Sequence, residues 1–196
     1  MNPDQEKNLL STAQTIAHHL TWAWNYSATL RGFQQYGQEC PAILCRNEHF
    51  VTTIIYALWD VLFLKLSHCS DNGRQATGFP KLFKQLQAYL PKQHELVTQM
   101  EAQRRRLKSL EVQSKVESWR HQVVAHYTIT SDYKAFHTKH VVSLGDIEQL
   151  IVEMEEILHK FTRPLWDLTV DVRRPGHQAR AGVARVVAGM KKEAET

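Results

Sequence analysis

Apolar residues recur at three- and four-residue steps through most of this chain, and that spacing is typical of amphipathic α-helices. The pattern is clearest over roughly 4–35, at Leu9, Leu10, Ala13, Ile16, Ala17, Leu20, Trp24 and Ala28. No alternating stretch of useful strand length accompanies it. The sequence therefore predicts an all-α fold, a bundle of four main helices with one short additional helix.

Turn signals delimit the next two helices. A helix over roughly 47–68 has a wide apolar face, so we expect it to be the most buried element. Ser70-Asp71-Asn72-Gly73 is a clear stop after it. Phe79-Pro80 then opens a short helix that ends at Pro91.

Two longer helices complete the predicted bundle. A charged helix runs from about 93 to 126, and its apolar spacing slips near 110–116, which predicts a bend or break there. Ser143, followed three residues later by Asp146, resembles a capping box. The final amphipathic helix starts at this pattern and stops at Arg163-Pro164.

The chain divides into a bundle over 1–166 and a tail over 167–196. The tail is rich in Ala, Gly, Val and basic residues, and Arg173-Arg174-Pro175-Gly176 interrupts it. Gly182 and Gly189 argue against a rigid helix over 177–192. We expect a flexible basic tail, with a specific RNA-binding arm as the alternative.

Composition sets broad limits on function. A hydrophobic content of 43% in 196 residues supports a packed core, and a net charge of +4 is compatible with a polyanionic partner. The three cysteines form no Cys-x-x-Cys pair, which favours a reducing compartment. The polar N-terminus is no signal peptide, and the apolar run Val51 to Leu64 contains Asp60 and is too short to span a bilayer. We expect a cytoplasmic protein with no membrane partner.

The segment Trp119 to His126, near the end of the long charged helix, contains the residues best suited to catalysis. Arg120 carries a permanent charge on a planar fork that fits phosphate, and His126 can move protons near neutral pH. Both can equally be ordinary residues of an amphipathic helix. Six residues along a helix separate two side chains by about 9 Å and about 120°. One copy therefore makes a poor site, whereas a two-fold axis gathers both pairs in one cleft.

The pattern Arg120-His121-Gln122-Val123-Val124-Ala125-His126 resembles the signature of HEPN-domain proteins, especially prokaryotic toxins and abortive-infection proteins. The helical order is also similar, with a loop and then the helix that contains 146–151. The stretch Tyr56-Ala57-Leu58-Trp59-Asp60 is similar to that family as well. The resemblance covers roughly residues 1–165 and leaves out the tail.

This resemblance implies a metal-independent endoribonuclease that acts as a homodimer and needs no cofactor. Arg120 and His126 correspond to the motif residues, and His121 takes the polar position after the arginine, where the family often has Asn or Asp. Such a protein is the effector of a toxin–antitoxin or phage-defence system. A partner that restrains it is implied, commonly a nucleotidyltransferase-like antitoxin.

Other residues are candidates for supporting roles. Asp60 is costly to bury unpaired, so it either pairs with an arginine such as Arg120 or lies at the edge of the apolar face. The basic run Arg104, Arg105, Arg106 and Lys108 is either a solvated face or an RNA-contacting one. The pairs His18-His19 and His137/His140 lack the further ligands of a metal site, so no metal is predicted.

Two other functions stay open at this point. The bundle can be a non-catalytic module that binds a partner or a nucleotide. It can also be purely structural, with an incidental arginine and histidine.

Overall fold

The computed structural model describes residues 1–73, 76–92, 94–121, 141–174 and 176–194, and all regular structure within these ranges is helical. The helices are, in chain order, α1 (Pro3–Glu39), α2 (Pro41–Arg46), α3 (Glu48–Ser70), α4 (Phe79–Tyr89), α5 (Glu95–Ser109), α6 (Glu111–Trp119), α8 (Leu144–Trp166) and α9 (Gly176–Ala194). The prediction of an all-α fold is confirmed.

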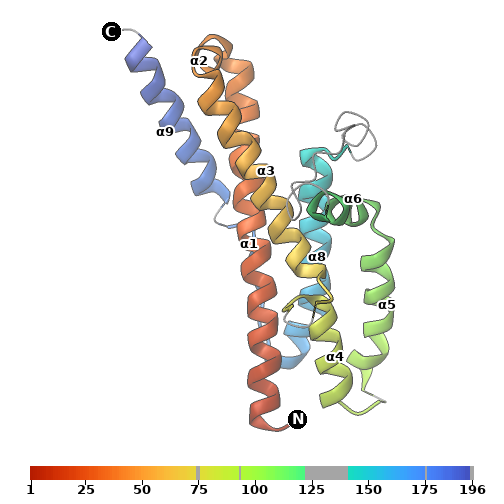
Figure 1. Cartoon of the computed structure of the whole chain (residues 1–196). Helices are drawn as coiled ribbons and strands as arrows, with labels where there is room; N and C mark the ends of the chain where they lie inside the picture. Colours follow the sequence, from red (N-terminus) through yellow and green to blue (C-terminus); the bar gives the residue numbers. More distant parts are fainter. Residues whose placement is uncertain (74–75, 93, 122–140, 175, 195–196) are drawn as a thin grey trace.

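Helix α1 is the long element against which most of the others pack. It has 37 residues and contacts α3, α4, α8 and α9 (Figure 1). Its start is fixed by a capping box, in which the Asn2 side chain accepts a hydrogen bond of 2.9 Å from the Gln5 backbone N–H and the Gln5 side chain accepts one of 3.0 Å from Asn2. Helix α1 is therefore the element around which α3, α4, α8 and α9 are arranged.

The main hydrophobic core lies between α1, α3, α4, α5, α6 and α8. Its largest fully buried side chains are Leu9, Ile16, Leu20, Leu62, Leu66, Phe79, Leu82, Leu86, Met100, Ile147, Leu150 and Phe161. The Ser143–Asp146 capping box begins α8 as predicted, with the Ser143 hydroxyl accepting a hydrogen bond of 3.1 Å from the Asp146 N–H. The expected helices over 47–68 and 79–91 correspond to α3 and α4.

The long charged helix expected from 93 is divided, which confirms the predicted break. Leu110 has extended backbone angles (φ −73°, ψ 108°) and separates α5 from α6. Figure 1 shows α6 lying across the direction of α5. This change of direction brings α6 against α3, the contact on which the candidate site depends.

The expectation that α3 is the most buried helix is wrong. α3 and α8 each have 23 residues, but α3 buries six of them and α8 buries nine. In the first half of α3, Phe50 and Tyr56 are more than half exposed, because neighbouring helices cover only part of its apolar surface. α3 also has the length and apolar composition of a membrane-spanning helix, properties that core helices of soluble proteins share. The absence of a membrane partner therefore stays a prediction.

In place of the expected flexible tail, residues 176–194 form α9, which packs against α1. Val183 and Val187, one helical turn apart, join Phe33 and Val51 in a second, smaller hydrophobic cluster. Gly32 allows the close approach, since a Cβ at that position would lie 3.1 Å from the Val183 Cβ. Burial of this short apolar stripe outweighs the poor helix propensity of Gly182 and Gly189.

Gly78, just before α4, allows the chain to fold back onto the end of α3. A Cβ at this position would lie 2.3 Å from the carbonyl oxygen of Cys69 and 2.5 Å from that of His68. Both contacts are with backbone atoms, which cannot move aside as a flexible side chain can. We expect Gly78→Ala to lower the free energy of unfolding by about 2–3 kcal/mol, measured by urea denaturation.

Gly182→Ala is the matched control for that change. Gly182 lies within α9 and has nothing within 4 Å of the added methyl group. Alanine has the higher helix propensity, so this variant should be more stable than the parent by up to about 1 kcal/mol. Equal stability of the two variants would contradict the close contact at Gly78.

Candidate functional site

An aromatic stack fixes α6 on α3 and so determines where Arg120 lies. The rings of Trp119 and Phe63 are nearly parallel, with centroids 5.4 Å apart and an interplanar angle of 11°. Trp59 also stacks on Phe63, with ring centroids 5.3 Å apart. Arg120 directly follows Trp119 at the end of α6, and its side chain reaches the C-terminal end of α3.

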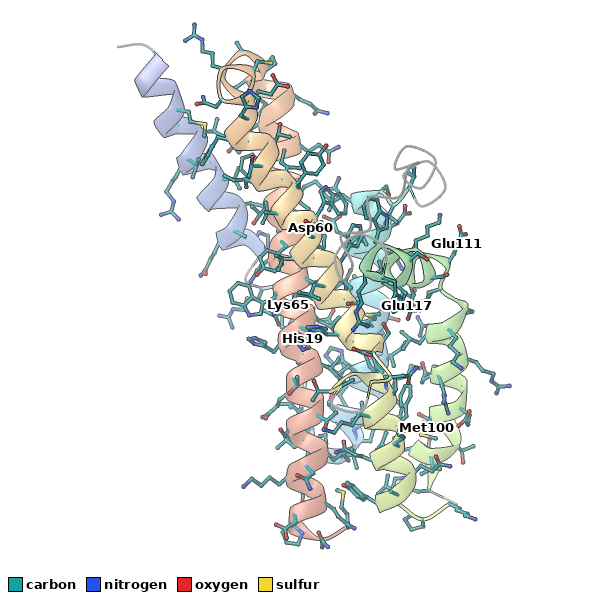
Figure 2. The ribbon with its side chains drawn as sticks, in the orientation of Figure 1. His19, Asp60, Lys65, Met100, Glu111 and Glu117 are labelled. Atoms are coloured by element: carbon teal, nitrogen blue, oxygen red, sulfur yellow. The ribbon has the colours of Figure 1, made fainter. Side chains whose placement is uncertain are left out.

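Arg120 forms an ion pair with Asp71, the C-cap residue of α3. Its Nη2 donates a hydrogen bond of 2.8 Å to Asp71 Oδ2, and both side chains are about three quarters buried. Asp60 had been considered as a partner of Arg120, but the structure assigns that role to Asp71. Asp60 lies near the middle of α3, farther from its C-terminal end (Figure 2). Arginine has five N–H donors, and the contact with Asp71 uses one nitrogen.

Asp71 is held as a carboxylate. Partial burial would raise its pKa, but hydrogen bonds from the Gly73 N–H and from Arg120, together with the positive charge of Arg120, outweigh burial and lower the pKa. The Gly73 N–H lies 2.9 Å from Asp71 Oδ1, so each carboxylate oxygen accepts a bond. The guanidinium of Arg120 therefore has a fixed, ionised partner.

Beside this ion pair, two histidines from different helices share a cavity of about 280 Å³. His19 comes from α1 and His68 from α3, and their ring centroids are 5.0 Å apart with an interplanar angle of 70°. Asp71, Gly73, Ala76 and Thr77 line the rest of the cavity. The site thus brings Arg120 close to two histidines within one chain.

Both histidines are held in the neutral form. Burial, the neighbouring His68 and the charge of Lys65 lower the pKa of His19 to about 4. Burial also lowers the pKa of His68, and the charges of Arg120 and Lys65 lower it further, against a smaller opposite effect of Asp71. Figure 2 shows His19 and Lys65 between α1 and α3. At pH 7 the rings therefore carry no charge.

The lowered pKa of His19 makes the fold sensitive to acid. His19 takes up a proton near pH 6.5 in the unfolded chain but only near pH 4 in the folded chain. The contribution of neutral His19 to stability is therefore complete above pH 6.5 and is lost as the pH falls to 4. The full difference is worth about 3 kcal/mol, and solvent screening of the partly exposed ring reduces it to about 1–2 kcal/mol. We expect His19→Gln to lose less stability than the parent between pH 6.5 and 4, measured by urea denaturation at each pH. An unchanged slope would contradict the neutral His19.

The remaining motif residues are only partly described. His121 is exposed at the end of α6. His126 lies outside the described residues, as do His137 and His140. The structure thus places Arg120 and its neighbour and leaves the position of His126 as a prediction.

Asp60 lies in a second cavity, of about 390 Å³, between α3, the end of α6 and the segment before α8. Aromatic side chains dominate its lining, with Tyr56, Trp59, Phe63 and Trp119 around the carboxyl group. Burial raises the pKa of Asp60, and within the described ranges it forms no ion pair. Asp60 is therefore close to the aromatic stack and apart from the ion pair of Arg120.

The basic run on α5 is divided between two roles. Arg106 bridges α5 to α8, through Glu153 and through a 3.0 Å contact between its Nη2 and Glu156 Oε2. Arg105 and Lys108 are exposed, and Arg104 lies 3.8 Å from Glu101 on its own helix. Arg104 and Lys108 also line a cavity of about 360 Å³ with Ser70 and Asn72, which flank Asp71. Arg106 is thus structural, and the other three face solvent.

Sequence reasoning missed His68 and Asp71 as site residues and considered His19 only as a metal ligand. The available signal was the position of His19 on the apolar stripe of α1, one helical turn from Ile16 and Ala23, which are buried. Asp71 was interpreted only as part of a helix stop. Among the residues that the structure describes, no group of three or more His, Cys, Asp or Glu side chains could hold a metal ion.

A protein-family comparison bears on this arrangement. The model of the HEPN AbiU2 family matches residues 44–181, which is more than two thirds of the chain. The chain belongs to the HEPN AbiU2 family. This is an abortive-infection family of HEPN proteins, which confirms the resemblance inferred from the sequence. No curated protein and no solved structure matches the chain.

The range of the HEPN AbiU2 match differs from the expected one. The resemblance was placed over roughly 1–165, whereas the match begins in α2 and extends into α9. His68, Asp71 and Arg120 lie inside the matched range, and so does the position of His126. His19 lies outside it, on α1.

Proposed function

We propose that this HEPN AbiU2 protein is a metal-independent endoribonuclease and acts in abortive infection, a form of defence against phage. The family membership supports the biological setting. The observation that supports the chemistry best is the Arg120 guanidinium, held by Asp71 beside two neutral histidines. A fixed cation next to proton-accepting groups suits a reaction in which charge develops on a phosphoryl group.

The proposed reaction is transesterification by the RNA 2′-OH. A base removes the 2′-OH proton, the 2′-oxygen forms a bond to the neighbouring phosphorus, and negative charge develops on the phosphoryl oxygens, where Arg120 stabilises it. The bond from phosphorus to the 5′-oxygen breaks, and an acid donates a proton to that oxygen. The products are a 2′,3′-cyclic phosphate and a 5′-OH end. We assign the proton transfers to His126, with His121 as the adjacent polar residue.

Two copies of the chain form the complete site in this proposal. Arg120 and His126 are about 120° apart on a continuous helix, so a two-fold axis is the simplest way to gather them around one phosphate. The RNA is expected to pass over the exposed basic side chains Arg104, Arg105 and Lys108. We further propose a cytoplasmic location, in keeping with the free thiols of Cys40, Cys45 and Cys69, and a nucleotidyltransferase-like antitoxin as partner.

The direct test is incubation of the purified protein with total RNA, with and without EDTA, beside the His126→Ala variant. Cleavage that survives EDTA, disappears in His126→Ala and leaves 2′,3′-cyclic phosphate ends is expected. DNA of the same sequence should resist, because it lacks the 2′-OH. Loss of cleavage in EDTA would contradict the metal-independent reaction, and a monomer at micromolar concentration would contradict the two-chain site.

A second candidate is a non-catalytic module that binds a nucleotide or a partner. The aromatic cavity around Asp60 favours it, since flat apolar walls with one carboxyl group suit a base. Nucleotide binding without any RNA cleavage, abolished by Asp60→Ala and unaffected by Arg120→Ala, would favour this candidate over the endoribonuclease.

A further inference from the structure

The cavity between His19 and His68 has polar groups in its lining that the packing of the core does not explain. Two imidazole rings, from α1 and α3, meet there at 5.0 Å, and the buried Nδ1 of His19 has no hydrogen-bond partner among the residues that the structure describes. Buried polar atoms are nearly always satisfied, so an unpaired nitrogen beside an open cavity indicates a missing partner. The cavity measures about 280 Å³, which leaves room for one.

Two positive charges, on Lys65 and Arg120, act on the histidines of this cavity. Lys65 lies on α3 one helical turn before His68, and its charge acts on both histidines. Arg120 acts on His68 from α6. Asp71, the one carboxylate among the described lining residues, has both oxygens engaged, by the Gly73 N–H and by Arg120. A cation is therefore disfavoured in the cavity and an anion is favoured.

We propose that this cavity binds a phosphate group of the RNA, with His19 and His68 as donors that become protonated when the phosphate enters. The identity of the anion as RNA rests on the proposed function. A phosphate oxygen accepts hydrogen bonds only, so it suits His19 Nδ1 once that nitrogen carries a proton. Burial and the charges of Lys65 and Arg120 keep the two imidazole rings unprotonated in the empty cavity. The negative charge of the phosphate offsets those two positive charges and so favours protonation of the rings.

Binding coupled to protonation has a definite pH dependence. The free rings bind few protons at pH 7, and a bound phosphate raises their affinity for protons, so phosphate binding takes up protons and strengthens as the pH falls. The charged and titratable groups around the rings are His18 on α1, Lys65 and Asp71 on α3, and Arg120 on α6. The lowered pKa of Asp71 keeps it ionised between pH 5.5 and 8, so we assign the pH dependence of binding to His19 and His68.

The test uses an oligonucleotide that the proposed reaction cannot cleave. A fluorescein-labelled 2′-O-methyl RNA lacks the free 2′-OH, and its binding is followed by fluorescence anisotropy from pH 8 to pH 5.5. We expect the affinity of the full chain to rise by about tenfold over this range. His19→Gln and His68→Gln should each lose most of that rise and bind about tenfold more weakly at pH 5.5. His49→Gln, at an exposed histidine near the start of α3, is the matched control and should follow the parent.

A measurement on the unaltered protein guards against variants that fail to fold. Inorganic phosphate is added at constant ionic strength, with chloride as the reference, and the imidazole C2–H signals are followed by NMR. The signals of His19 and His68 should shift toward the protonated form with phosphate and stay in place with chloride. Unmoved signals, or a pH dependence of binding that both glutamine variants retain, would overturn the proposal.

The two proposals fail in different ways. If the protein cleaves no RNA but binds the oligonucleotide through His19 and His68, the endoribonuclease proposal fails and the phosphate site stands. If it cleaves RNA while both glutamine variants bind and cleave as the parent does, the phosphate site fails and the endoribonuclease stands.

Discussion

Replacing Arg120 by alanine should lower kcat for RNA cleavage by about a hundredfold to a thousandfold. In the proposed reaction the guanidinium stabilises the phosphoryl oxygens, and removing one such donor typically has an effect of this size. Asp71 holds it at 2.8 Å, so the loss removes a group that is already oriented. The measurement is single-turnover cleavage of a labelled RNA, with circular dichroism and light scattering to show that helicity and the proposed dimer match those of the parent.

Two further variants make this prediction specific. Arg120→Lys keeps the charge and loses the planar fork, so it should retain only a small part of the activity. Arg46→Ala removes an exposed arginine at the end of α2 and should cleave as the parent does. Cleavage by Arg120→Ala at the rate of Arg46→Ala would exclude Arg120 from the reaction.

Replacing His126 by alanine should lower kcat by about a hundredfold to ten-thousandfold, the usual range for a lost acid or base. The proposal assigns this residue the proton transfers, so its loss removes the acid and the base of the reaction. The acidic side of the pH–rate profile should also change, because the histidine that the proposal assigns to proton transfer is removed. Single-turnover rates from pH 5.5 to 8.5 provide the test.

Chemical rescue separates the two roles. Imidazole added to His126→Ala can carry protons and should restore part of the rate, whereas it should not restore Arg120→Ala. His49→Ala, an exposed histidine near the start of α3, is the control for the loss of a histidine as such. Full activity of His126→Ala would assign proton transfer to other residues, with His19, His68 and His121 as candidates among the described histidines.

The parts of the fold that were predicted correctly depend on local signals. The break at Leu110 follows from a slip in apolar spacing, and the start of α8 follows from Ser143 and Asp146, three residues apart. Periodicity indicates which face of a helix is apolar, but it does not say how much of that face a neighbour covers. For that reason α3 was placed too deep, with Phe50 and Tyr56 largely exposed in the structure.

The site itself depends on contacts between distant parts of the sequence. The ion pair joins Arg120 to Asp71, 49 residues earlier, and the histidine pair joins α1 to α3. Helical spacing contains no information on such pairings. The sequence therefore suggests Asp60, a charged residue within an apolar run, as a partner for Arg120 instead of Asp71. The packing of α9 was missed for the same reason, since Val183 and Val187 gain their importance only from Phe33 and Val51.

The long helix α1 has a consequence for any shortened form of this protein. The family match begins at residue 44, yet α1 supplies Leu9, Ile16 and Leu20 to the main core, Phe33 to the smaller cluster and His19 to the cavity. A chain cut to the matched range would expose the apolar faces of α3 and α8 to water together, which promotes aggregation, and it would also lack Val183 and Val187 of α9. The family-defining segment and the smallest independently folding unit are therefore different stretches of this chain.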